Sequence, residues 1–150
     1  MTDDLSSELA ATAWELMREL VLNNERRREV SDVLGMSFSR AKALRYVAES
    51  PVPMGELATK LGIAAPYMPL VVDDLERQGL VVRKPHPRDR RAKLVHATRG
   101  GKLAARRANA ILERPPPELK GLPIEELAEL VRVLGTAQPT TPPERSATPG

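Results

Sequence analysis

The chain has 150 residues, 41% hydrophobic and 29% charged, which suits one compact folded domain or two very small ones. It contains no cysteine, so disulfide frameworks, thiolate zinc sites and thiol redox switches are excluded. No apolar run approaches the ~20 residues that a membrane-spanning helix needs, and the acidic beginning of the chain does not resemble a signal peptide. We therefore predict a cytoplasmic protein that does not bind membranes.

The first predicted element is one long helix over residues 4–29, a range without proline or glycine. Its apolar stripe consists of Leu5, Leu9, Ala13, Leu16, Met17, Leu20 and Val21. A helix of this length extends about 39 Å at about 1.5 Å per residue, which is further than one small domain can cover. We therefore expect a second subunit to cover the stripe.

A second helix is predicted to begin after Ser37, which can cap it, and to end at the prolines of "ESPVP". Two short helices are predicted to follow within residues 54–79, separated by a turn at Gly62, which can adopt a positive φ. The buried face of the first of them consists of Leu57, Ala58 and Leu61.

Two β-prone runs, "LVVRK" and "KLVHA", are joined by a polar loop of six or seven residues and predict a hairpin. Thr98 can cap a further helix over 99–113, which the prolines from Pro115 onward end. A last amphipathic helix is predicted over 123–135, and the proline-rich residues 136–150 are predicted to be a disordered tail.

The order helix, short turn, helix, hairpin is typical of a winged helix-turn-helix. A small residue at Ala58 lets the second helix cross closely, and Gly62 allows the tight turn. An ordinary corner between two helices produces the same pattern over 54–79, but it does not explain the basic hairpin that follows. We therefore favour the winged helix-turn-helix.

Positive charge is concentrated between Val81 and Arg107, where ten Lys or Arg accompany a single acid, Asp89. This range carries +9 whereas the whole chain carries +3, so the remaining residues sum to −6. A block of this kind is either a solvated basic loop or a surface that binds polyanions.

The motifs "LATKLGI", "DDLERQGLVVR", "DRRAK" and "ATRGGK" occur in this order between Gly35 and Lys102. With them the sequence resembles the multiple antibiotic resistance regulator (MarR) family of winged-helix transcription factors. The resemblance implies a mainly α (α+β) fold with a winged helix-turn-helix lobe, about 36–98, inside a single domain, 1–135. It also implies that N- and C-terminal helices form an intertwined homodimer; these dimerisation helices would be about 4–29, 99–113 and 123–135.

The resemblance also assigns roles within the predicted wing. It implies that Arg91 enters the minor groove of duplex DNA and that Asp89 holds it in position, with Arg90 beside them. Arginine suits a narrow and strongly negative minor groove on physical grounds as well. The other wing cations are expected to contact phosphates or to remain solvated surface charges: Arg83, Lys84, Arg88 and Lys93.

The second helix of the motif departs from the family pattern, which places Ser, Thr, Asn, Gln or Arg near the start of this recognition helix. The corresponding residues here are Ala65, Pro66, Tyr67, Pro69 and Leu70. Pro69 fits only if the helix begins late, near Pro66, or is kinked. Three accounts are open: apolar contacts with thymine methyl groups, positioning by phosphate contacts, or loss of DNA reading in favour of a protein partner. We favour the first two together.

We therefore predict a DNA-binding transcriptional regulator, a repressor that binds a pseudo-palindromic operator on double-stranded DNA as a homodimer. The alternative is a winged-helix protein-interaction module without its own operator. The resemblance further implies control by a small lipophilic or aromatic anionic effector, with Arg45 as its counter-ion. The pocket residues would be Trp14, Met17, Phe38, Arg45 and Tyr46, which a second interpretation treats as ordinary core residues.

No metal, cofactor or enzymatic site is predicted. His86 and His96 lack an acidic partner in a ligand pattern. Glutamates on the last helix are typical of a solvated helix face: Glu125, Glu126 and Glu129. The sequence contains no Gly-rich phosphate loop, no nucleophile with a matching base and no paired carboxylates, so we do not expect an enzyme.

Overall fold

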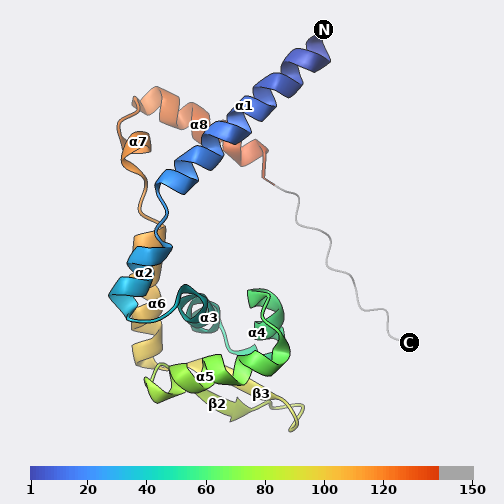
Figure 1. Ribbon diagram of the computed structural model, residues 1–150, viewed down its shortest axis with the longest axis vertical. Helices are drawn as coiled ribbons and strands as arrows, with labels where there is room; N and C mark the ends of the chain where they lie inside the picture. Colours follow the sequence, from blue (N-terminus) through green and yellow to red (C-terminus); the bar gives the residue numbers. More distant parts are fainter. Residues whose placement is uncertain (139–150) are drawn as a thin grey trace, which may run out of the picture. The chain divides into compact units, whose positions relative to one another are not determined.

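The computed structural model describes residues 1–138 (Figure 1). The chain divides into two units, Met1–Arg114 and the residues from Pro115 onward. The first unit contains a small three-stranded sheet among helices, so the predicted mainly α class with a winged-helix lobe is confirmed. The predicted disordered tail, 136–150, lies outside the described residues from position 139 onward.

The single helix predicted over 4–29 is wrong, because the structure has two helices in its place. α1 spans Thr2–Asn23 and α2 spans Arg27–Leu34. None of the residues of α1 is buried. Its exposed apolar side chains include Leu5, Leu9, Trp14, Leu16, Val21 and Leu22. Within residues 1–138, α1 therefore buries no apolar face.

Local side-chain bonding accounts for the break between α1 and α2. The Asn24 side chain donates to the carbonyl of Leu20 at 2.9 Å, and the Glu25 carboxylate accepts from the backbone N–H of Arg27 at 2.9 Å. Side chains that bond neighbouring backbone groups compete with helix continuation. Because neither proline nor glycine marks the break, the sequence pattern did not indicate it.

The predicted caps and turns of the central helices are confirmed. Ser37 precedes α3 (Phe38–Glu49), and its Oγ accepts from the backbone N–H of Arg40 at 3.3 Å. α4 spans Met54–Leu61 and ends at Gly62, whose φ of 64° lies in the left-handed region. Only glycine adopts this region without steric cost, so the turn after α4 depends on that residue.

The sheet has the strand order β1-β3-β2 and is antiparallel. β2 (Val81–Pro85) and β3 (Lys93–Ala97) form the predicted hairpin. β1 (Val52–Pro53) was not predicted, because its prolines indicated only the end of a helix. An edge strand tolerates proline since its outer N–H groups need no partner, and β1 lies at such an edge.

The core lies where α3, α4, α5 (Met68–Arg77) and the sheet meet, and α2 and α6 (Arg99–Leu112) lie side by side against α3. Thr98 caps α6 as predicted, since its Oγ1 accepts from the backbone N–H of Gly101 at 3.0 Å. The largest fully buried side chains are Leu44, Leu57, Met68, Leu75, Val30, Val47, Val72, Val81 and Val95.

The second unit contains α7 (Pro117–Lys120) and α8 (Ile124–Thr136), the helix predicted over 123–135. No residue of α8 is buried. Its exposed large apolar side chains are Ile124, Val131, Val133 and Leu134. On its polar face the Arg132 guanidinium donates to Glu129, which lowers the pKa of that carboxyl group. Like α1, α8 therefore presents apolar side chains that no described residue of its unit buries.

Candidate nucleic-acid interface

The two-helix motif is built by α4 and α5, with a short 3-10 helix, Ala65–Tyr67, between them. α5 begins only at Met68, so Pro69 lies in its first turn. Proline is tolerated there because the first N–H groups of a helix have no intrahelical partner. Pro69 was expected to fit only if the helix begins late or is kinked, and the helix does begin late.

The outer face of α5 combines apolar and acidic side chains. Its inner face is formed by Met68, Val71, Val72 and Leu75. Leu70 on the opposite side is 59% exposed, and Tyr67 just before the helix is 62% exposed. Asp73 lies one turn beyond Leu70, and its side chain is 50% exposed. Ala65 and Pro66, in the 3-10 helix, are exposed as well.

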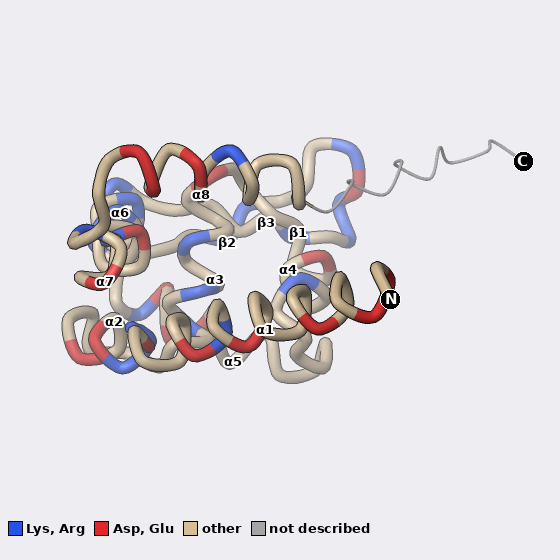
Figure 2. Tube along the Cα trace, turned by 90° about the horizontal axis from the view of Figure 1, so that it is seen from above, with Lys and Arg blue, Asp and Glu red and all other residues tan. Residues whose placement is uncertain are grey.

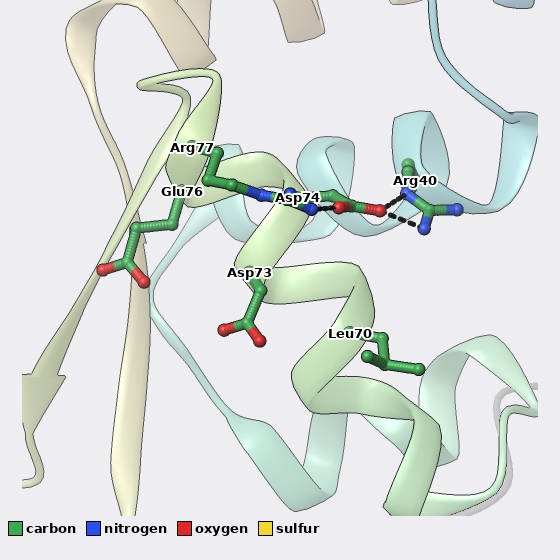
Figure 3. A pocket seen from close by; sticks show the side chains of 6 residues that line it. All are labelled: Arg40, Leu70, Asp73, Asp74, Glu76 and Arg77. Carbon is green, nitrogen blue, oxygen red and sulfur yellow. Dashed lines mark hydrogen bonds and ion pairs between the residues drawn. The ribbon is translucent and has the colours of Figure 1, made fainter.

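A hollow of about 680 Å³ beside α5 is lined by Asp73, Asp74 and Glu76, and two arginines hold Asp74 there (Figure 3). Asp74 accepts from Arg40 of α3, with a Nε–Oδ2 distance of 2.8 Å, and also pairs with Arg77. Partly exposed pairs of this kind stabilise a fold by at most about 1 kcal/mol each. Their main effect is to reduce the negative potential of the helix surface. Sequence spacing indicates only the Asp74–Arg77 pair of this network, because Arg40 lies on another helix.

Arg83 connects the wing to α5. It lies on β2, where it faces back to pair with Asp73, and its Nε lies 3.5 Å from the Glu76 carboxylate. Its side chain is only 27% exposed. We had expected Arg83 to contact phosphates or to be solvated. In the structure it holds the hairpin against α5 and balances two carboxylates.

The wing tip, residues 86–92, is ordered by bonds to its own backbone. The Asp89 carboxylate accepts from the backbone N–H of Arg91 at 3.0 Å, and the N–H of Ala92 donates to the Asp89 carbonyl at 3.1 Å. The N–H of His86 donates to the Ala92 carbonyl at 3.1 Å and closes the loop. Asp89 therefore orders the backbone that carries Arg91 instead of bonding its guanidinium.

The other predicted wing cations are all exposed. Figure 2 marks Lys and Arg positions in blue along the hairpin of β2 and β3. Within residues 1–138 none of the exposed wing cations has an ion pair: Lys84, Arg88, Arg90, Arg91 and Lys93. The wing thus presents unneutralised positive charge, while the acids of the neighbouring helix are paired. The hairpin and α5 together form a surface whose accessible charge is mainly positive.

The residues of the predicted effector pocket are not brought together within the chain. Trp14 and Met17 are exposed on α1, whereas Phe38 packs against the core of the lobe. The Arg45 Nε donates to Asn109 of α6 at 2.5 Å. Tyr46 lies under the ammonium group of Lys60, 5.4 Å from the ring centroid. Phe38 and Tyr46 therefore have packing roles.

Residues 1–138 contain no group of three or more His, Asp or Glu side chains placed to hold a metal ion. No helix in that range is both long enough and apolar enough to cross a membrane.

Two helices joined by a tight turn and followed by a β-hairpin define a winged helix-turn-helix protein. Residues 34–92 match the model of the MarR family. This match bears out, over residues 34–92, the resemblance drawn from the sequence motifs.

Solved structures show how far this fold extends along the chain. A MarR family protein from Bacillus stearothermophilus is 22% identical with a TM-score of 0.72, and the match covers 87% of this chain and 94% of that one. Wild-type MarR from E. coli is 23% identical with a TM-score of 0.63, over 83% and 96%. MepR from S. aureus, solved as a DNA complex, is 19% identical with a TM-score of 0.57, over 83% and 99%. The chain thus has the fold of MarR family transcriptional regulators.

Proposed function

We propose that this protein is a transcriptional regulator that binds double-stranded DNA as a homodimer and represses by occluding a promoter. The observation that carries the proposal is the charge arrangement of the interface. Within residues 1–138 the wing-tip cations have no ion pair, whereas arginines pair the acids of α5. A solved complex of a protein with the same fold, MepR with DNA, supports this assignment.

In this proposal Arg91 enters the minor groove beside the motif, while Arg88, Arg90 and nearby lysines approach phosphates. A narrow minor groove concentrates negative potential and favours arginine over other side chains. The bond from the Arg91 backbone to Asp89 limits the conformations of the loop that carries the guanidinium. Less conformational entropy is then lost when the side chain enters the groove.

The start of α5 would read the major groove mainly through apolar contact. Pro69 and Leu70 present no hydrogen-bonding side-chain group, and a thymine methyl group is the base feature that such side chains recognise. Tyr67 is exposed enough to reach a phosphate. Pairing of Asp73 with Arg83 lowers the electrostatic cost of bringing this helix close to DNA.

The dimer would form through the apolar side chains of α1 and α8, which no described residue of either unit buries. Exposed apolar stripes of this length mark association surfaces. A twofold dimer presents two identical motifs, so each would occupy one half of a pseudo-palindromic operator.

We also propose that an aromatic or lipophilic anion controls DNA binding. Arg45 would be the counter-ion, and a partner subunit would have to complete a pocket that includes Trp14 and Met17. An effector changes operator affinity only through unequal affinity for two arrangements of the dimer. Adding aromatic carboxylates to the protein–DNA complex tests effector control. If none of them releases the DNA, effector control is contradicted.

Selection of bound fragments from a random duplex library tests the function. We expect saturable binding to duplexes with two thymine-containing half-sites, and affinity that falls steeply between about 50 and 200 mM salt as counterions are released. Replacing thymine by uracil in a selected half-site removes the methyl group and should weaken binding. No duplex binding even in dilute buffer would contradict the proposal and leave the protein-interaction module as the remaining interpretation.

A charged substitution on α1 tests the dimer. We expect Leu16→Asp to shift the protein from dimer to monomer in sedimentation velocity, because the carboxylate would be buried without a partner in the interface. Since Leu16 is exposed in the single chain, the lobe should keep its helical circular dichroism signal. Arg18→Ala on the same helix is the matched control. A monomeric wild-type protein would contradict the assignment of the interface.

A further inference from the structure

The wing tip contains a hydrogen-bonding arrangement that the proposed function does not use. The Nδ1 atom of His86 accepts from two successive backbone N–H groups, those of Arg88 at 3.1 Å and Asp89 at 3.3 Å. The acceptor thus lies two and three residues before the N–H groups that it binds. In turns, this acceptor is usually the side chain of Asp, Asn, Ser or Thr. Here an imidazole supplies it.

This arrangement requires the neutral form of the imidazole. A neutral ring has one nitrogen that accepts, whereas both nitrogens of a protonated ring are donors. Protonation would therefore place an N–H group of His86 against the two backbone N–H groups. The closure of the loop therefore depends on which form of the imidazole is present.

The charged groups on the elements around His86 are known from the structure. The loop itself contributes Arg88, Asp89, Arg90 and Arg91, β2 contributes Lys84 and β3 contributes Lys93. β1 contributes no titratable side chain. The Asp89 carboxylate already accepts from the N–H of Arg91. Apart from Asp89, all of these groups are cations, and a protonated His86 would add a further positive charge to them.

We propose that His86 is a positioning residue of the wing: its neutral Nδ1 fixes the backbone that presents Arg88, Arg90 and Arg91, and its protonation loosens the wing and weakens DNA binding. The effect on binding rests on the proposed function. The effect on the loop does not, because the two bonds exist in the free protein. Acid would therefore act on this protein against the usual trend, in which added positive charge strengthens binding to DNA.

The sign of the pH effect is the first test. Wild-type affinity for a selected duplex, measured by fluorescence anisotropy at constant ionic strength, should fall on the order of fivefold to tenfold from about pH 7.5 to pH 5.5 as two net hydrogen bonds are lost. His86→Asn supplies a side-chain oxygen for the same N–H groups and does not titrate, so it should bind like the wild type at pH 7.5 and lose the fall. His96→Asn removes the other histidine of the chain and should keep it.

A second measurement separates this inference from the proposed function. In the free ¹⁵N-labelled protein, the amide resonances of Arg88 and Asp89 should titrate together with the His86 imidazole, and this response should disappear in His86→Asn. If those amides titrate but no duplex binds at any pH, the proposed function fails and the role in the loop stands. If DNA binds and His86→Asn keeps the wild-type pH profile, or if affinity rises in acid through His86, the inference is overturned.

Discussion

Arg91→Ala is expected to weaken binding to a selected duplex on the order of tenfold to a hundredfold, the range found for a single arginine inserted in a groove. Its backbone is fixed by Asp89, and its side chain has no ion pair within residues 1–138. The substitution therefore removes a DNA contact without breaking a contact of the fold. Thermal unfolding should be nearly unchanged, and the slope of log affinity against log salt should fall by about 1.

The matched control for Arg91 is Arg18→Ala, which removes the same charge from α1. Both variants lower the net charge by one, so a purely general electrostatic effect would weaken binding equally. We expect Arg18→Ala to retain most of the affinity, because the wing contact depends on position as well as charge. Equal losses in the two variants would show that Arg91 acts only through the overall field of the protein.

Elements governed by local chemistry could be predicted from the sequence. The caps at Ser37 and Thr98, the left-handed turn at Gly62 and the hairpin of "LVVRK" and "KLVHA" were all placed correctly. In each case the residues that determine the backbone are adjacent in the chain. A side-chain oxygen next to free N–H groups, or a glycine at a positive φ, acts the same way in many folds.

The break after α1 and the strand β1 could not be predicted for different reasons. The break depends on whether the Asn24 and Glu25 side chains bond the backbone or face solvent, and the sequence does not decide between the two. β1 exists only because Val52 lies opposite Val95, a residue far away in the chain. A two-residue strand is too short to show a periodic pattern, so only its pairing with β3 identifies it as a strand.

The electrostatics of the candidate site also depended on contacts between distant residues. On the helix alone, the carboxylates of α5 would repel the phosphates of DNA. The structure pairs Asp73 with Arg83 of β2 and Asp74 with Arg40 of α3, on elements separate from α5 in the sequence. The sequence thus indicated a positively charged wing, but not that Arg83 of the wing pairs with the acids of α5.

Gly101→Ala is expected to destabilise the protein by roughly 3 kcal/mol, at the upper end of the cost of overpacking. A Cβ at this position would lie 1.9 Å from the carbonyl oxygen and 2.9 Å from the carbonyl carbon of Leu80. Both are backbone atoms, which cannot rotate away as a flexible side chain can. The carbonyl of Leu80 also accepts from the N–H of Thr98 at 3.0 Å, so moving it would disturb the residue that caps α6.

The neighbouring Gly100 provides a control with the opposite expected sign. A Cβ there would meet the Thr98 Oγ1 at 3.7 Å and the Gly79 carbonyl oxygen at 3.9 Å, both ordinary contacts. Since alanine favours a helix over glycine by up to about 1 kcal/mol, Gly100→Ala should be neutral or stabilising. Urea unfolding of the two variants measures the difference. Similar stability of both would show that α6 can move away from the start of β2, and the wing would then be less rigidly attached to the lobe than the contact at Gly101 indicates.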